Sequence, residues 1–289
     1  MATRQELRYD PSASYSVTEK DVVYLSTDGA VRYARVYQPD GPGPFPVLVS
    51  VHGGAWSRGD HTNNAVTSGP IAASGVVVMT IGLRVAPEFP YPAQVQDANL
   101  AIRWGRMHAE KYNGDPGAVG AIGYSSGGHT LPLAGMRPND SRYSALLLEG
   151  SAEARLDWMV VCWPVIDSHA RYEVAKANGS ERLITNTEGY FLTEEAMHEG
   201  NPQELLDRGE TVAMPPTLVI HGTADENVPV EHAERFVGSY AAAGGSVRFE
   251  KFEGEPHGFA NEPGPATDRM VEVVKQFIAE QVNTLQAAA

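Results

Sequence analysis

Short runs of apolar residues recur along the chain and are separated by longer stretches in which apolar residues return with a helical period. The runs lie at 46–51, 75–81, 119–123, 158–163, 217–221 and 247–252. In most of them the apolar residues do not alternate with polar ones, as they would in a strand with one solvent-exposed face. This favours strands that are buried on both faces of a parallel sheet. Helix-like stretches lie between most of them, at 64–74, 93–112, 126–136, 230–243 and 266–282. This alternation predicts an α/β fold with helices on both faces of the sheet.

The chain begins with a polar stretch, residues 1–18, which we interpret as an arm. Two further strand-like runs follow at 22–26 and 31–37, and Asp28-Gly29 between them is a strong hairpin signal. The sequence therefore predicts eight strands in a mostly parallel sheet, of which the first two form an antiparallel hairpin. We expect residues 1–289 to form a single domain.

One long connection interrupts the alternation of strands and helices. About 50 residues separate the run ending near Trp163 from the run starting at Thr217, and a connection of that length within one domain is usually functional. We predict a small helical cap, an insertion at 168–214, lying over the edge of the sheet. Its segment 193–210 is rich in Asp and Glu, which would place negative charge near an entrance.

Residues 123–128 read GYSSGG, between a strand-like run and a helix-like run. A G-x-S-x-G pattern in that context is typical of a nucleophile turn, in which the serine hydroxyl is pushed out of a tight strand-to-helix bend. The glycines are needed because side chains at both flanks would collide with backbone. The register of the pattern makes Ser125 the candidate nucleophile, while Ser126 offers its backbone N–H.

Residues 52–56 read HGGAW and directly follow an apolar strand. Glycines let this backbone approach a bound carbonyl, so its N–H groups can donate to an oxyanion. We expect Gly54 and Ala55 to form an oxyanion hole together with Ser126. We expect His52 to anchor the loop instead of acting as a base.

A nucleophilic serine needs a histidine base, and the base needs a carboxylate that orients it. Asp225 and His257 each come just after a predicted strand, at the sheet edge where doubly wound folds place their sites. Their order after Ser125 is the order Ser, Asp, His expected for this turn. Glu226 is an alternative acid, but the register favours Asp225. The predicted catalytic triad is therefore Ser125, Asp225 and His257.

No histidine or cysteine spacing typical of a metal site is present, so we expect no metal. The single cysteine, Cys162, ends an apolar run and reads as a buried core thiol. A lone cysteine permits no internal disulfide, and the polar N-terminus does not resemble a secretory signal. Both observations predict a cytoplasmic protein.

The composition is that of an ordinary globular protein, with 42% apolar and 20% charged residues. It adds one piece of information, a net charge of −14, from 22 Lys and Arg against 36 Asp and Glu. Nucleic acids and anionic lipid surfaces need a basic partner, so we expect neither as a ligand. No apolar run is long enough to span a bilayer.

Together these motifs resemble the α/β-hydrolase superfamily, and within it the hormone-sensitive-lipase-like and acetyl-xylan- and feruloyl-esterase-like serine carboxylesterases. The segment APEFPYPA at 86–93, followed by Asp97, is similar to the segment that follows the fourth strand in that family. Two positions depart from the lipase-like pattern, because Ala55 stands in place of a third glycine and Ser126 in place of alanine. The resemblance implies an α/β-hydrolase fold and ester hydrolysis through an acyl-enzyme, without a cofactor.

We therefore expect a carboxylic ester hydrolase for a small-molecule ester, with Trp56, Tyr124 and Trp163 lining its pocket, although Trp163 could equally belong to the core. The acidic insertion favours neutral, short-to-medium acyl esters.

Kynurenine formamidases share a similar HGGxW loop, so an arylformamidase that hydrolyses an amide is one alternative. A non-catalytic hydrolase-fold receptor is another. A prolyl-oligopeptidase-like peptidase would need an additional β domain, for which the chain has no room. A homodimer is possible.

Overall fold

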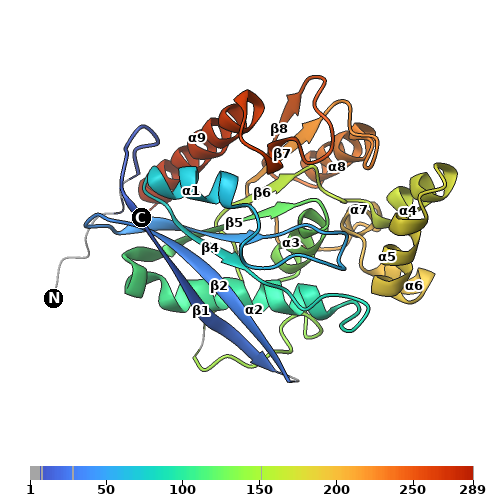
Figure 1. Cartoon of the computed structure of the whole chain (residues 1–289), viewed down its shortest axis with the longest axis horizontal. Coiled ribbons are helices and arrows are strands. Elements are labelled where there is room, and N and C mark those ends of the chain that lie inside the picture. The colour runs from blue at the N-terminus through green and yellow to red at the C-terminus, as the bar shows by residue number, and fades with distance from the viewer. Residues whose placement is uncertain (1–6, 8, 28, 151, 289) are drawn as a thin grey trace.

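One eight-stranded sheet runs through the computed structural model, which describes residues 7, 9–27, 29–150 and 152–288 (Figure 1). Its strand order is β1-β2-β4-β3-β5-β6-β7-β8. The strands are β1 (Val17–Thr27), β2 (Ala30–Pro39), β3 (Phe45–Val51), β4 (Val77–Ile81), β5 (Gly114–Tyr124), β6 (Met159–Cys162), β7 (Thr217–Gly222) and β8 (Val247–Phe252). The predicted eight strands are all found, with boundaries shifted by a few residues.

The sheet is parallel from β4 to β8, as the continuous apolar runs predict. β1 and β2 form the expected antiparallel hairpin, in which Thr27 pairs with Ala30. Asp28, on which the hairpin signal depends, lies outside the described residues, as do residues 1–6 and 8 of the predicted arm. β2 also pairs with β4 in antiparallel orientation, a feature that the sequence analysis does not anticipate. The prediction of a mostly parallel sheet with an antiparallel hairpin is thus confirmed.

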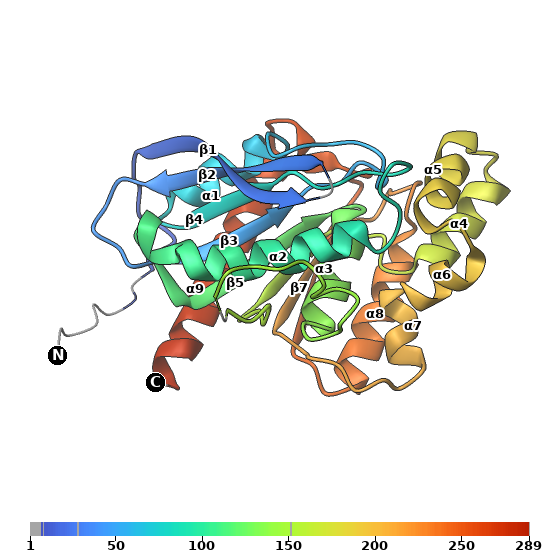
Figure 2. The ribbon, with the colours of Figure 1, turned by 90° about the horizontal axis from the view of Figure 1, so that it is seen from below.

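Helices cover both faces of the sheet because alternate strand residues point to opposite sides. Val49, Ala121 and Val161 pack in one core layer with α2 (Ala93–His108), α3 (Gly127–Met136) and α8 (Val230–Ala242). Leu48 and Val160 pack in a second layer with α1 (Ala65–Ala73) and α9 (Pro265–Ala287). In Figure 2, α2 and α3 lie on the face of the sheet that is turned toward the viewer. The short helices η1 (Ala109–Tyr112) and η2 (Phe259–Asn261) complete these layers.

Four short helices fill the long connection between β6 and β7. They are α4 (Ser168–Ala177), α5 (Glu181–Phe191), α6 (Glu194–Glu199) and α7 (Pro202–Asp207). They gather at one end of the molecule, beyond the carboxyl ends of the parallel strands (Figures 1 and 2). A separate apolar cluster, which includes Trp56, Tyr190, Phe191 and Met197, joins them to the loop after β3.

The loops after β3, β5, β7 and β8 emerge at the same edge of the sheet. Parallel register aligns Val51 with Gly123, and Tyr124 with Cys162, so neighbouring strands end at one level. Residues far apart in sequence, such as those near 125, 225 and 257, therefore meet at this edge. Among the described residues, no helix is long and apolar enough to cross a membrane.

Candidate active site

Ser125 occupies a bend between β5 and α3 with a backbone φ of +52°, a left-handed conformation that is uncommon for serine. The positions that flank this bend require glycine, because any Cβ there would collide with backbone atoms. A Cβ on Gly123 would lie 2.5 Å from the Gly127 carbonyl oxygen, and a Cβ on Gly127 would lie 2.3 Å from that of Val51. The bend is fixed on both sides, because the Ser125 N–H donates to the Cys162 carbonyl at 2.9 Å and the Ser125 carbonyl accepts from Val165 N–H at 3.0 Å.

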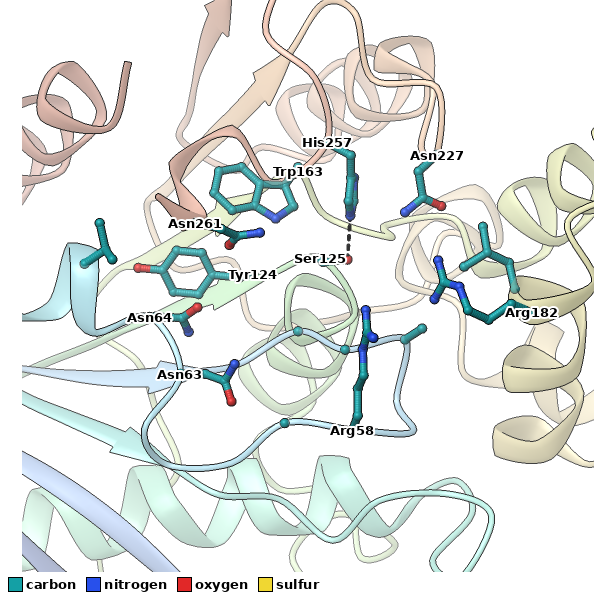
Figure 3. Close-up of a pocket in the computed structure, with 16 residues that line it drawn as sticks. Arg58, Asn63, Asn64, Tyr124, Ser125, Trp163, Arg182, Asn227, His257 and Asn261 are labelled. Atoms are coloured by element: carbon teal, nitrogen blue, oxygen red, sulfur yellow. Dashed lines mark hydrogen bonds between the residues drawn. The ribbon is translucent and has the colours of Figure 1, made fainter. Parts of the chain in front are cut away.

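Three of the predicted side chains form a continuous hydrogen-bonded chain. Ser125 Oγ lies 2.9 Å from His257 Nε2, as the dashed line in Figure 3 marks, and His257 Nδ1 lies 2.7 Å from Asp225 Oδ2. Because the carboxylate can only accept, the imidazole proton sits on Nδ1. His257 Nε2 is then the acceptor for the serine hydroxyl. The arrangement is able to move a proton from the hydroxyl to the ring.

Asp225 is buried and its carboxylate is surrounded by donors. Its Oδ1 accepts from the backbone N–H groups of Asn227 at 2.9 Å and Val228 at 2.8 Å, while His221 Nε2 lies 3.2 Å from Oδ2. Burial raises the pKa of the Asp225 carboxyl, but hydrogen bonds from His221 and His257 outweigh burial and hold the pKa well below its usual range. The group therefore stays ionised. Glu226, the alternative acid, is exposed and makes no hydrogen bond to His257 among the described residues.

The loop after β3 brings free backbone donors close to Ser125. Gly54 and Ala55 border the same cavity as Ser125 and both have positive φ. In the part of the chain that the structure describes, no hydrogen bond uses the N–H groups of Gly54, Ala55 or Ser126. His52 is buried beneath them, with Nδ1 2.6 Å from the Gly53 carbonyl oxygen and Nε2 accepting from Leu83 N–H at 3.4 Å.

Ser125 lies in the wall of a cavity of about 440 Å³. Tyr124 and Trp163 line it as predicted, and both rings stand beside it in Figure 3. Trp56 does not, and this part of the pocket prediction is wrong. The indole turns inward, where its Nε1–H donates to His129 Nδ1 at 3.2 Å and its ring stacks on Tyr190 at 5.0 Å. Trp56 is only 1% exposed and supports the loop from behind.

The rest of the cavity wall contains polar side chains that sequence reasoning missed. They are two arginines and four asparagines, namely Arg58, Arg182, Asn63, Asn64, Asn227 and Asn261. Among the described residues, no carboxylate and no residue of the acidic segment 193–210 lines the cavity. The acidic segment therefore does not form part of the cavity wall. Several of its acids instead pair with arginines elsewhere, such as Glu199 with Arg137.

The structure also brings together three potential metal ligands that the sequence analysis treats as scattered. His169, Glu194 and His198 offer ligand atoms that lie within 4.8 Å of one another on α4 and α6. None of the three lines the Ser125 cavity. His169 Nε2 already lies 3.2 Å from Glu194 Oε1, and His198 Nδ1 lies 2.8 Å from Glu204 Oε1, so hydrogen bonds to carboxylates account for this grouping.

Comparison with known proteins gives consistent similarities. A family model described as BD-FAE matches residues 35–239. Esterase LipC of Mycobacterium tuberculosis is 33% identical over 246 residues, covering 81% of this chain and 58% of LipC. The chain spans less than two thirds of the length of this and two further curated relatives from the same organism.

Solved structures agree on the fold. A butyrate-bound esterase, Est2 of Thermogutta terrifontis, superposes with a TM-score of 0.72 at 25% identity, covering 91% of this chain and 94% of its own. An inhibited esterase B from Lactobacillus rhamnosis gives a TM-score of 0.80 at 18% identity, covering 96% and 92%. At that identity the second likeness concerns the fold alone.

Proposed function

The chain belongs to the BD-FAE family of α/β-hydrolases, and from this premise we propose that it is a serine carboxylesterase acting through an acyl-enzyme. One observation carries the proposal, namely the hydrogen-bonded chain from Ser125 through His257 to Asp225 at the wall of a cavity. The similarity to esterases such as LipC supports the reaction class.

In the proposed mechanism, Ser125 Oγ attacks the ester carbonyl while His257 Nε2 takes the hydroxyl proton. A tetrahedral intermediate forms, and its collapse breaks the bond to the alcohol oxygen, which receives the proton from His257. Water then attacks the acyl-enzyme, again losing a proton to His257, and the acid leaves as Ser125 regains its proton. Asp225 holds the ring and stabilises the imidazolium that forms in both halves.

The negative charge of the tetrahedral intermediate needs donors that are already in place. We assign this role to the backbone N–H groups of Gly54, Ala55 and Ser126, which have no partner among the described residues and lie at the loop and bend beside Ser125. Ser126 begins helix α3, so the positive end of the helix dipole faces the same place.

The helices α4–α7, within residues 168–214, are assigned as the cap of this site. Arg182 and Leu183 of α5 contribute to the cavity wall. A cavity of about 440 Å³ suits a small ligand. We accordingly expect acyl groups of short to medium length, and the butyrate bound by Est2 is of that size. The acyl group and the alcohol are to be found by testing substrates.

Two alternatives stay open to experiment. An arylformamidase would use the same three side chains on an amide, whereas a receptor would bind without turnover. A fluorophosphonate probe should label the wild type and leave Ser125→Ala unlabelled. A panel of p-nitrophenyl esters, run beside N-formylkynurenine, then separates ester from formamide hydrolysis. Absence of both labelling and turnover in the folded wild type contradicts the proposal and favours a receptor. A cytoplasmic location and a homodimer remain predictions for fractionation and light scattering.

A further inference from the structure

Two arginines stand at the wall of the Ser125 cavity, on separate elements. Arg58 belongs to the loop after β3, and Arg182 belongs to α5 of the cap. Figure 3 shows both side chains reaching toward Ser125 from different sides. Since no carboxylate lines the wall in the described part of the chain, no negative side chain there offsets their two positive charges.

Neither arginine has an internal partner. Within the described part of the chain, no hydrogen bond or ion pair involves the side chain of Arg58 or Arg182. Nearby arginines behave differently. Arg137 and Arg142 bind Glu199, and Arg235 binds Asp207. In a chain with 36 acidic and 22 basic residues, two arginines beside the nucleophile thus keep their charges available for a ligand.

A third arginine lies behind this wall. Arg171 of α4 is 1% exposed, and its guanidinium sits 5.1 Å from the centre of the Trp56 ring. Its Nε and Nη1 atoms are buried without a hydrogen-bond partner in the described structure. Burial, together with repulsion from Arg182, lowers the pKa of Arg171 to about 10. A buried cation without a counter-charge is costly, and a bound anion nearby would offset that cost.

We propose that the ester hydrolysed at this site carries a free carboxylate, which binds between Arg58 and Arg182. This inference rests on the proposed esterase function and names the substrate class. A guanidinium offers two parallel N–H groups that match the two oxygens of a planar carboxylate. Asn63, Asn64 and Asn261 provide amide groups for an uncharged polar part of the same molecule.

An adjoining hollow extends the site past Arg182. It shares Arg182, Leu183 and Asn227 with the cavity, and Glu226 is the acid in its wall. Glu226 therefore lies on the same side as Arg182 and would compete with an incoming carboxylate. Removing the Glu226 charge should therefore increase the preference for an anionic ester, whereas removing the two arginine charges should decrease it.

The experiment compares p-nitrophenyl hydrogen adipate with its primary-amide analogue, which has the same size but no charge. For the wild type in 0.1 M NaCl, we expect kcat/KM to favour the carboxylate at least tenfold. The ratio should fall several-fold in 1 M NaCl, where the Debye length shrinks to about 3 Å. It should approach unity in the double variant R58Q/R182Q, survive in part in R58K/R182K, and increase in E226Q.

Lys20 on β1 is a matched control, because it is another exposed cation without an ion pair among the described residues and it lies outside the cavity wall. The ratio in K20Q should equal that of the wild type. A wild-type ratio at or below unity, or a ratio that survives in R58Q/R182Q, overturns the inference. So does a preference for a phosphonate analogue over the carboxylate.

The failure of this inference is distinguishable from failure of the esterase function. If S125A-sensitive turnover of both esters occurs with no charge preference, only the inference falls. If neither ester is turned over, the fluorophosphonate probe and the ester panel decide the esterase proposal, and binding of adipate to the Ser125→Ala protein by calorimetry still decides the inference. Binding that weakens at least tenfold in R58Q/R182Q supports the anion site, and equal binding, or none to either protein, rejects it.

Discussion

At the scale of single residues, two adjacent serines of the site have different roles, one through its side chain and the other through its backbone. Ser125 presents its hydroxyl to His257, whereas the hydroxyl of the next residue, Ser126, turns back and accepts from Trp56 N–H at 3.2 Å. The backbone N–H of Ser126 stays free for an oxyanion. Two neighbouring serines thus have distinct roles that a substitution can tell apart.

Replacing Ser125 by alanine should lower kcat by about 10³-fold or more, because only binding and oxyanion stabilisation remain. Ser126→Ala should cost less than about tenfold, since it removes one side-chain hydrogen bond to the loop, worth about 1 kcal/mol, and keeps the backbone donor. Steady-state kinetics on one p-nitrophenyl ester measure both. Comparable losses in the two folded variants would show that the register of the turn is wrong.

How far the sequence predicted the site depends on whether each residue belongs to a local motif. Ser125 and the glycines around it are readable because the bend itself requires them. Arg58 lies only two residues beyond the HGGAW motif, yet an exposed arginine carries no local signal of what it faces. Arg182 comes from a helix whose position over the sheet is set by long-range packing, which one sequence does not reveal.

At the scale of elements, the strands were predictable because parallel pairing buries both faces, so their apolar runs are conspicuous. The positions of the charged side chains of the insertion relative to the site were not predictable. Its acids are visible in sequence, but their partners Arg137 and Arg142 lie between α3 and β6 and are brought to them only by the fold. The positive φ of Trp56, which sends its indole away from the cavity, likewise has no local signal.

Two glycines in different helices should respond in opposite ways to alanine. At Gly127 a Cβ would lie 2.3 Å from the Val51 carbonyl oxygen, so Gly127→Ala should destabilise by about 3 kcal/mol or more and impair the bend. At Gly238 in α8 an added Cβ would have no atom within 4 Å beyond its chain neighbours and its own turn of helix, so Gly238→Ala should stabilise by about 0.5–1 kcal/mol. Urea denaturation measures both, and equal effects would contradict the contact argument.

His129 ties three elements together and should make stability depend on pH. Its Nδ1 accepts from Trp56 Nε1–H at 3.2 Å, and its Nε2–H donates to the Gly200 carbonyl at 2.6 Å, so α3 holds both the loop after β3 and the cap. Burial lowers the pKa of His129 to about 4. The backbone hydrogen bond to Gly200 raises it, and the Arg171 charge lowers it further.

The sign follows from proton counting. Between about pH 6.5 and 4 the unfolded chain binds a proton at this position that the folded protein does not, so stability is lost as the pH falls through that range. The loss from His129 should reach about 3 kcal/mol. His129→Gln, whose amide can both accept and donate here, should remove that part of the pH slope in chemical denaturation. An unchanged slope would assign the pH dependence to other groups.

At the scale of the whole molecule, the charge of −14 sets a background against which the local arginines act. A folded chain of this length confines that charge within a radius of about 20 Å, whereas the unfolded chain spreads it over a much larger volume. Self-repulsion therefore destabilises the folded state. Ion pairs closer than 4 Å are screened less by salt than charges separated across the surface.

Adding sodium chloride should consequently stabilise the protein at pH 8. Between 10 and 200 mM the Debye length falls from about 30 Å to less than 10 Å, which removes most repulsion across the molecule. We expect the free energy of unfolding to rise by on the order of a few kcal/mol, and Tm by roughly 5 °C. The control is the same titration at pH 5.0, near the sequence pI of about 5.0, where the net charge nearly vanishes and the salt effect should vanish with it. Calorimetry at both pH values provides the measurement. An equal rise in Tm at both would show that salt acts through hydration or specific ion binding, and that the net charge contributes nothing measurable to stability.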